Sequence, residues 1–165
     1  MATDARPTRP TSENRDYDLL KRAARAVGVV FLLVGVAGFV PGITTDYGEL
    51  TVAGPDSEAK LLGIFQVSIL HNLVHLAFGA LGLWAAQHWS SARLFLVGGG
   101  AVYLLLWLYG LVIDKDGDAN FVPVNTADDW LHLGLGLGMV ALGALLWNGR
   151  PARARAARNT ASRNR

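Results

Sequence analysis

The sequence predicts an all-α fold: a four-helix transmembrane bundle with both termini in the cytoplasm and two longer outer loops. The first observation is composition, since 52% of the 165 residues are hydrophobic and the mean hydropathy is +0.30. The second is distribution, because the apolar residues gather in four segments that we expect to be spans, at about residues 24–40, 61–86, 92–113 and 129–147. The third is length, since about 20 apolar residues in a helix cross the roughly 30 Å of hydrocarbon in a bilayer.

The four segments differ in how they begin and end. The first ends at Pro41-Gly42, a helix-stopping turn, and lacks a clear cleavage site, so we expect a retained span rather than a signal peptide. The second and third are comfortably long enough to cross a bilayer. The fourth follows Thr126, which together with Asp129 makes a plausible capping box at its start.

Two longer loops are expected on the outer side. In the loop 41–60 we expect a small hairpin lid, with Asp56 or Ser57 capping the second helix. The loop 114–128 offers oxygen ligands at alternate positions, as a calcium loop does. The positions where a calcium loop needs a glycine and a bidentate glutamate hold other residues, so a solvated acidic loop is the expectation.

Basic residues set the expected orientation. Most lie in two tails: Arg6, Arg9, Arg15, Lys21, Arg22 and Arg25 at one end, and Arg150, Arg153, Arg155, Arg158, Arg163 and Arg165 at the other. Because Lys and Arg stay on the cytoplasmic side, we expect a multi-pass protein of the bacterial cytoplasmic membrane with both tails inside. We expect disordered tails at 1–20 and 149–165 around a membrane domain at 21–148. The expected partner is the lipid bilayer, with no nucleic acid.

A seam of polar and small side chains is predicted inside the bundle. The second segment carries Ser68, His71, Asn72, His75, Gly79 and Gly82 within one arc, and the fourth carries His132, Gly136, Met139 and Gly143 on one stripe. Gly134 and Gly138 form a small-xxx-small surface on another side of the fourth segment. Glycines at such spacings let helix backbones approach closely, so these glycines are candidate packing positions.

The three histidines of the seam are candidate metal ligands. His71 and His75 stand four residues apart, so their imidazoles share one side of a helix, and His132 is a possible third ligand. The chain has no cysteine, which excludes thiolate sites and leaves zinc, copper or haem iron as the metals such a site would suit. If the second helix begins at residue 61, His71 lies roughly 15 Å from the outer end of its helix, whereas His132 lies roughly 6 Å from the outer end of the fourth helix. Two histidines that bind one haem need nearly the same depth, so this difference counts against haem. The alternatives are hydrogen bonds between helices, a proton path, or a small-ligand site.

Three stretches carry a family resemblance. They are LGIFQVSILHNLVH at 62–75, WLYGL at 107–111 and NFVPVNTADDWLH at 120–132. These resemble the bacterial membrane family catalogued as domain of unknown function 4383, over roughly residues 20–148. The resemblance implies a four-helix integral membrane protein found mostly in high-GC Gram-positive bacteria. It implies no activity, cofactor or catalytic residue.

Three functions follow as expectations. The first is an accessory or interaction subunit, more a binding protein than an enzyme, which packs against itself or a larger membrane complex through its glycine surfaces. The second is a metal- or haem-binding membrane protein that uses the buried histidines. The third is a small transporter or channel subunit. The last is weakened because no Asp, Glu, Lys or Arg lies centrally in any segment.

Overall fold

The structure is a computed structural model that describes residues 12–146, so the predicted tail 149–165 and residues 1–11 of the predicted tail 1–20 lie outside it. Four helices dominate: α1 (Ser12–Ala37), α2 (Ile69–Ala85), α3 (Trp89–Val112) and α4 (Thr126–Leu145). Between α1 and α2 lie three short strands, β1 (Thr44–Thr45), β2 (Lys60–Leu61) and β3 (Phe65–Gln66), and one turn of 3-10 helix, η1 (Tyr47–Glu49). The prediction of a mainly helical fold with four helices is confirmed.

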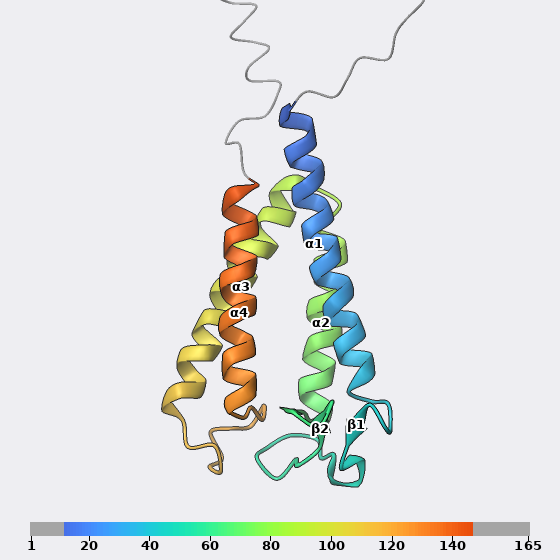
Figure 1. The fold of residues 1–165 in the computed structure, drawn as a ribbon, viewed down its shortest axis with the longest axis vertical. Helices are drawn as coiled ribbons and strands as arrows, with labels where there is room; N and C mark the ends of the chain where they lie inside the picture. The colour runs from blue at the N-terminus through green and yellow to red at the C-terminus, as the bar shows by residue number, and fades with distance from the viewer. Residues whose placement is uncertain (1–11, 147–165) are drawn as a thin grey trace, which may run out of the picture.

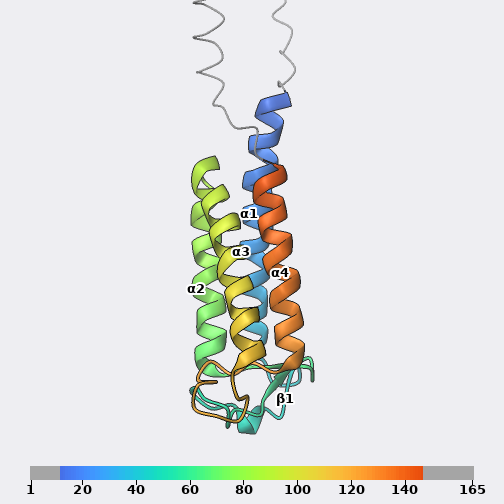
Figure 2. The same ribbon diagram turned by 90° about the vertical axis from the view of Figure 1, so that its left-hand side faces the viewer.

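The helices form two antiparallel pairs. α1 packs chiefly on α2, and α3 packs chiefly on α4, as Figure 1 shows. Turned by 90°, the four helices run along one common direction (Figure 2). The N-terminal end of α1 and the C-terminal end of α4 lie at one end of the bundle, and the strands and the segment before α4 lie at the other. We call these the terminal end and the loop end.

The loop end corrects the prediction for the second segment. Residues 61–68 are not helical, because β1, β2 and β3 form one antiparallel sheet with Thr44 opposite Leu61 and Lys60 opposite Gln66. The turn between β2 and β3 places Gly63 at φ +70°, a conformation that glycine adopts without strain. An apolar run of this kind is as consistent with a short strand as with a helix. The prediction of a span beginning at residue 61 is therefore wrong at its first eight residues.

Two predicted caps also shift. Ser68 caps α2, since its Oγ accepts the His71 N–H at 3.1 Å, whereas Ser57 donates its hydroxyl to the Val67 carbonyl at 2.7 Å. At α4 the capping box is formed by Asn125 and Asp128, one residue before the predicted pair of Thr126 and Asp129. Asn is among the strongest N-cap residues because its side-chain oxygen satisfies orphan amide groups of the first turn.

Glycines allow the closest helix contacts. A Cβ built on Gly79 would lie 2.7 Å from the Leu32 amide nitrogen of α1, and one on Gly82 would lie 2.8 Å from the Gly28 Cα. In the other pair, a Cβ on Gly100 would lie 2.8 Å from the Gly136 carbonyl oxygen. Gly143 is similarly packed, against α3. By contrast, Gly134 and Gly138 meet no atom within 4 Å, so that surface of α4 packs against nothing within the described residues.

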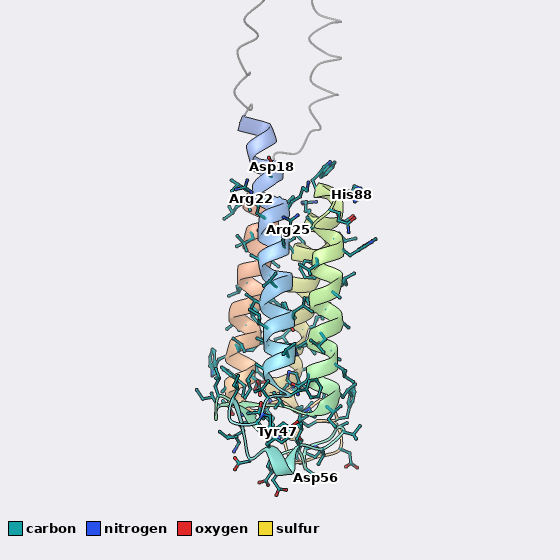
Figure 3. The ribbon with its side chains drawn as sticks, turned by 90° about the vertical axis from the view of Figure 1, so that its right-hand side faces the viewer. Asp18, Arg22, Arg25, Tyr47, Asp56 and His88 are labelled. Carbon is teal, nitrogen blue, oxygen red and sulfur yellow. The ribbon has the colours of Figure 1, made fainter. Side chains whose placement is uncertain are left out.

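The helices expose large apolar side chains, and several polar side chains are buried in the bundle together with its apolar core. Exposed side chains on the helices include Leu33 (63% exposed), Leu105 (64%) and Leu137 (55%), whereas His71, Asn72, His75, Asp128, Asp129 and His132 are buried. Charged residues concentrate near the two ends, where Figure 3 labels Asp18, Arg22 and Arg25 at the terminal end and Asp56 at the loop end. Of the described helices, α3 alone is long and apolar enough to cross a membrane by length and composition, and α2 is apolar but shorter.

Candidate functional site

Three histidines from the two helix pairs meet the same cavities near the loop end. His71 and His75 come from the first two turns of α2, and His132 comes from the second turn of α4. Because α2 begins at Ile69, His71 lies near the start of its helix, and the large difference in depth expected from a start at residue 61 does not exist. All three side chains are buried, between 4% and 7% exposed.

Aromatic rings connect the histidines across the bundle. The His71 and His75 rings stack with centroids 4.7 Å apart, and His75 lies 5.4 Å from the Phe31 ring of α1. Phe31 in turn lies 5.3 Å from Tyr103 of α3, whose ring meets His132 edge-on at 5.1 Å. Such tilted and edge-to-face pairs are favourable geometries for aromatic rings. They hold the imidazoles of both helix pairs in fixed orientations.

Backbone carbonyls fix the tautomer of two of these histidines. His71 Nδ1 lies 3.0 Å from the Pro123 carbonyl oxygen, and His75 Nδ1 lies 3.0 Å from the His71 carbonyl oxygen. A carbonyl oxygen only accepts, so Nδ1 carries the proton in both rings. In the neutral imidazole, Nε2 then presents a lone pair. Within residues 12–146 neither Nε2 takes part in a hydrogen bond, so both are free to accept one.

Two buried nitrogen atoms of the site have no hydrogen-bond partner among the described residues. They are Asn72 Nδ2 and His132 Nδ1. Asn72 is 1% exposed, and its amide fits against the backbone of Gly38, where any Cβ would collide with it. A buried donor without a partner costs about 1–3 kcal/mol, so such atoms in a native site point to a bound molecule or water.

Two cavities adjoin the histidines. The α2–α3 cavity, of about 160 Å³, is bounded by all three histidines together with Tyr103, Tyr109 and Phe121. The α1–α4 cavity, of about 200 Å³, is bounded by the same histidines together with Asn72, Asp128 and Val34. The imidazoles therefore have space on two sides. A water molecule needs only about 10–15 Å³ measured in this way, so either cavity has room for a small organic molecule.

Asp128 adds a carboxyl group to the α1–α4 cavity. Its Oδ2 accepts the Gln66 N–H at 3.0 Å and the Asn125 N–H at 2.8 Å, which ties β3 and the start of α4 together. No described residue donates to its Oδ1. Asp128 is 2% exposed and lies in the first turn of α4, ahead of the predicted span. Burial raises its pKa to about 7, against the smaller lowering effect of the two backbone N–H donors.

The carboxylate of the neighbouring Asp129 forms an ion pair. Lys115 donates to both of its carboxylate oxygens, at 2.8 and 2.9 Å, in a single ion pair that closes the segment before α4 onto the helix. Gly110 of α3 makes room for this pair, since a Cβ there would collide with the Asp129 carboxylate. Lys115 is thus engaged by Asp129. Among the described residues, Asp128 has no basic side chain within ion-pair distance.

The geometry gives no support to a metal centre formed by the three histidines. Although they adjoin common cavities, no group of three or more His, Cys, Asp or Glu side chains in residues 12–146 is placed to hold a metal ion. The site instead presents hydrogen-bonding groups of both kinds, acceptors at His71 Nε2 and His75 Nε2 and a donor at Asn72 Nδ2.

Some of the predicted seam residues meet at the site, one has another role, and one further residue belongs to the site. Asn72 and the three histidines come together, whereas Ser68 serves as the cap of α2 and contributes its oxygen to the backbone. Asp128 is the site residue that the sequence analysis did not select. One signal for it was available, since Asp128 precedes His132 by four residues and so shares a helix face with it.

The fold and site define a small helical-bundle protein with a buried polar site between two helix pairs. The family model described as domain of unknown function, DUF4383, matches residues 21–145, and the chain belongs to this family. No curated protein and no solved structure matches the chain. The matched range covers all four helices except the first part of α1 and includes every residue of the site.

Proposed function

We propose that the chain is an integral membrane protein that binds a small molecule in the buried site between its two helix pairs. The membrane part of the proposal is supported by the apolar surface of the helices. Residues 26–45, 61–92, 94–113 and 130–149 contain no Asp, Glu, Lys or Arg, and large apolar side chains are exposed on all four helices. Soluble monomers rarely expose apolar surface of this extent.

Orientation is part of the same proposal. The terminal end carries Lys21, Arg22 and Arg25, while exposed acidic residues gather at the loop end. Since basic residues remain in the cytoplasm, the terminal end lies inside and the histidine site lies near the outer surface of the bacterial cytoplasmic membrane.

Cysteine labelling tests the membrane location without background, because the chain has no cysteine. Three single variants are compared: Asp56→Cys at the loop end, Arg25→Cys at the terminal end and Leu105→Cys on the exposed surface of α3. In intact cells, a membrane-impermeant maleimide is expected to label the first only, and after lysis the first two. Labelling of Leu105→Cys as fast as Asp56→Cys would contradict burial of α3 in lipid.

Binding is carried by one observation: imidazoles with unused lone pairs and a buried unpaired amide adjoin cavities larger than a water molecule. Apart from the Asp128 carboxyl group, the other residues of the cavity walls are apolar or aromatic. A site of this composition suits a small, mainly apolar molecule that carries one or two hydrogen-bonding groups. The walls of the α2–α3 cavity include Tyr109 (40% exposed) and Phe121 (57% exposed), so this cavity is bounded by surface residues and is reachable from outside the bundle.

Native mass spectrometry tests for a retained molecule. The chain is extracted from membranes in mild detergent and compared with His71→Ala and with His88→Ala, a matched control at an exposed histidine of the terminal end. We expect a small-molecule adduct on the wild type and on His88→Ala, and its loss from His71→Ala. Spectra of all three that show only the bare chain, before and after incubation with a membrane lipid extract, would contradict the proposal.

A second candidate function is association with another membrane helix, through Gly134 and Gly138. The observation that favours it is their open surface, since the other described α4 glycines, Gly136 and Gly143, pack against α3. Small-xxx-small surfaces allow close helix association in lipid. If the partner is a second copy, oxidation of Gly138→Cys in membranes gives a disulfide-linked dimer, whereas Leu105→Cys on α3 does not. Equal crosslinking of the two variants would indicate random collision.

A further inference from the structure

The α1–α4 cavity contains a carboxyl group without an ion-pair partner among the described side chains. Asp128 is buried, and Lys115, whose charge favours its ionised form, is itself paired with Asp129. Placing an isolated carboxylate away from water is costly, and proteins avoid the cost by protonating the group or by bringing a cation to it. An ionised Asp128 would therefore be stabilised by a bound cation.

The free acceptors belong to residues that bound the same cavity. Asp128 Oδ1 receives no hydrogen bond from a described residue, because both backbone donors use Oδ2. His71 and His75 adjoin this cavity with Nε2 unbonded, since Nδ1 of each ring already donates to a carbonyl. One carboxylate oxygen and two imidazole lone pairs form a set of acceptors that suits a group with several N–H donors. An ammonium group has three such donors and a positive charge.

Apart from Asp128, Asn72 and the three histidines, the residues that line the cavity are apolar. Val34 of α1, Leu61 of β2, Phe65 of β3 and Leu135 of α4 bound it, and its volume is about 200 Å³. This combination excludes a large hydrated ion as the best occupant, because apolar walls cannot replace a hydration shell. A short alkyl chain attached to the ammonium group would fill the apolar part.

The surroundings of the cavity favour the approach of cations. Exposed acidic residues of the loop end are Asp46, Glu49, Asp56, Glu58, Asp114, Asp116 and Asp118, against two lysines in the same loops. Surface potential of one sign raises the local concentration of oppositely charged ligands. We propose that the α1–α4 cavity binds a small alkylammonium ion, with the ammonium group at Asp128 Oδ1 and the alkyl chain in the cavity that His71 and His75 also bound. This inference rests on the proposed small-molecule function and names the ligand class.

Binding is expected to be linked to protons. The titratable groups that face Asp128 are Asp129 and His132 on α4, His71 and His75 on α2, and Lys115 in the segment before α4. Only the ionised carboxylate attracts the ammonium group. Since burial raises the pKa of Asp128 to about 7, affinity is expected to fall as the pH is lowered below neutrality.

Isothermal titration of the full chain in an uncharged detergent tests the proposal, with n-butylammonium chloride as the probe at about pH 8. The neutral n-butanol has the same number of heavy atoms and is the matched control. We expect saturable binding of n-butylammonium, weakened at least about tenfold by Asp128→Asn and unchanged by Asp118→Asn, an exposed acid of the same end. Both variants are first checked for wild-type circular dichroism and melting temperature.

The outcomes separate this inference from the proposed function. Equal affinity of wild type and Asp128→Asn, or equal affinity for butylammonium and butanol, overturns the ammonium site. If butanol binds saturably and His71→Ala abolishes its binding, the small-molecule function stands while the ammonium assignment falls. If neither probe binds saturably, the ammonium site is rejected, and the proposed function then depends on the mass-spectrometry result alone.

Discussion

Replacing Asp128 by Asn should remove a specific pH dependence from the stability of the protein. In the folded chain, burial raises the pKa of Asp128 to about 7, from an ordinary value of 3.8 in the unfolded chain. Between these two values the folded state binds a proton that the unfolded state has released, so stability falls as the pH rises through this range. The stabilisation from this proton is fully present below the pKa of Asp128 in the unfolded chain, and it is lost above the pKa of Asp128 in the folded chain.

The magnitude follows from the difference in pKa. Three pKa units correspond to about 4 kcal/mol in total, of which about 2–3 kcal/mol is lost between about pH 5 and about pH 8. Asn keeps an oxygen that can accept from both backbone N–H groups, of Gln66 and Asn125, but carries no charge. The stability of Asp128→Asn should therefore change less over this range than that of the wild type, by about 2–3 kcal/mol.

The assay is equilibrium unfolding in mild detergent by added sodium dodecyl sulfate, followed by tryptophan fluorescence at several pH values. Asp128→Ala is the matched control, since it removes both the charge and the acceptor. It should show the same weak pH dependence as Asp128→Asn but be less stable at every pH, by about 1–3 kcal/mol, because two N–H groups lose their partner. Parallel pH profiles for wild type and Asp128→Asn would show that the Asp128 carboxyl group does not gain a proton on folding.

Three further substitutions test the packing. Gly38→Ala should lower the free energy of unfolding by about 1–3 kcal/mol, because a Cβ would collide with the Asn72 amide, and a variant as stable as wild type would refute that contact. Gly134→Ala should leave stability equal or higher, by up to about 1 kcal/mol, since it fills open space and favours the helix; the same assay checks it. Tyr109→Phe should cost about 1 kcal/mol through loss of the 2.5 Å hydrogen bond to the Ala119 carbonyl, measured as a lowered melting temperature.

Helix number and order could be predicted from the sequence, because long apolar segments between polar loops leave few alternatives. The boundaries could not all be predicted. Residues 61–68 are apolar enough to extend α2. In the structure, β2 and β3 instead pair as a hairpin, and β2 also pairs with Thr44 and Thr45 of the distant strand β1. The competing N-caps, Ser57 and Ser68, are chemically equivalent in the sequence. Tertiary structure decides between them.

The histidines of the site could be selected from their spacing, but their arrangement could not. Because α2 was predicted to begin at residue 61, His71 was expected to lie much deeper than His132. In the structure the two residues adjoin the same cavities. Asp128 was not among the predicted site residues. Oδ1 of Asp128 is free because the Gln66 and Asn125 N–H groups both bind Oδ2. The choice of oxygen cannot be predicted from the sequence.

Nitrogen-15 NMR of the histidine side chains tests whether this cavity is the binding site, because it reports the protonation of each ring nitrogen in the folded protein. We predict that His71 and His75 are neutral with the proton on Nδ1, and that their Nε2 resonances shift when n-butylammonium binds. His71→Ala and His75→Ala assign the signals. Rings protonated on Nε2, or Nε2 resonances that do not respond to any ligand that binds the protein, would contradict the assignment of this cavity as the binding site.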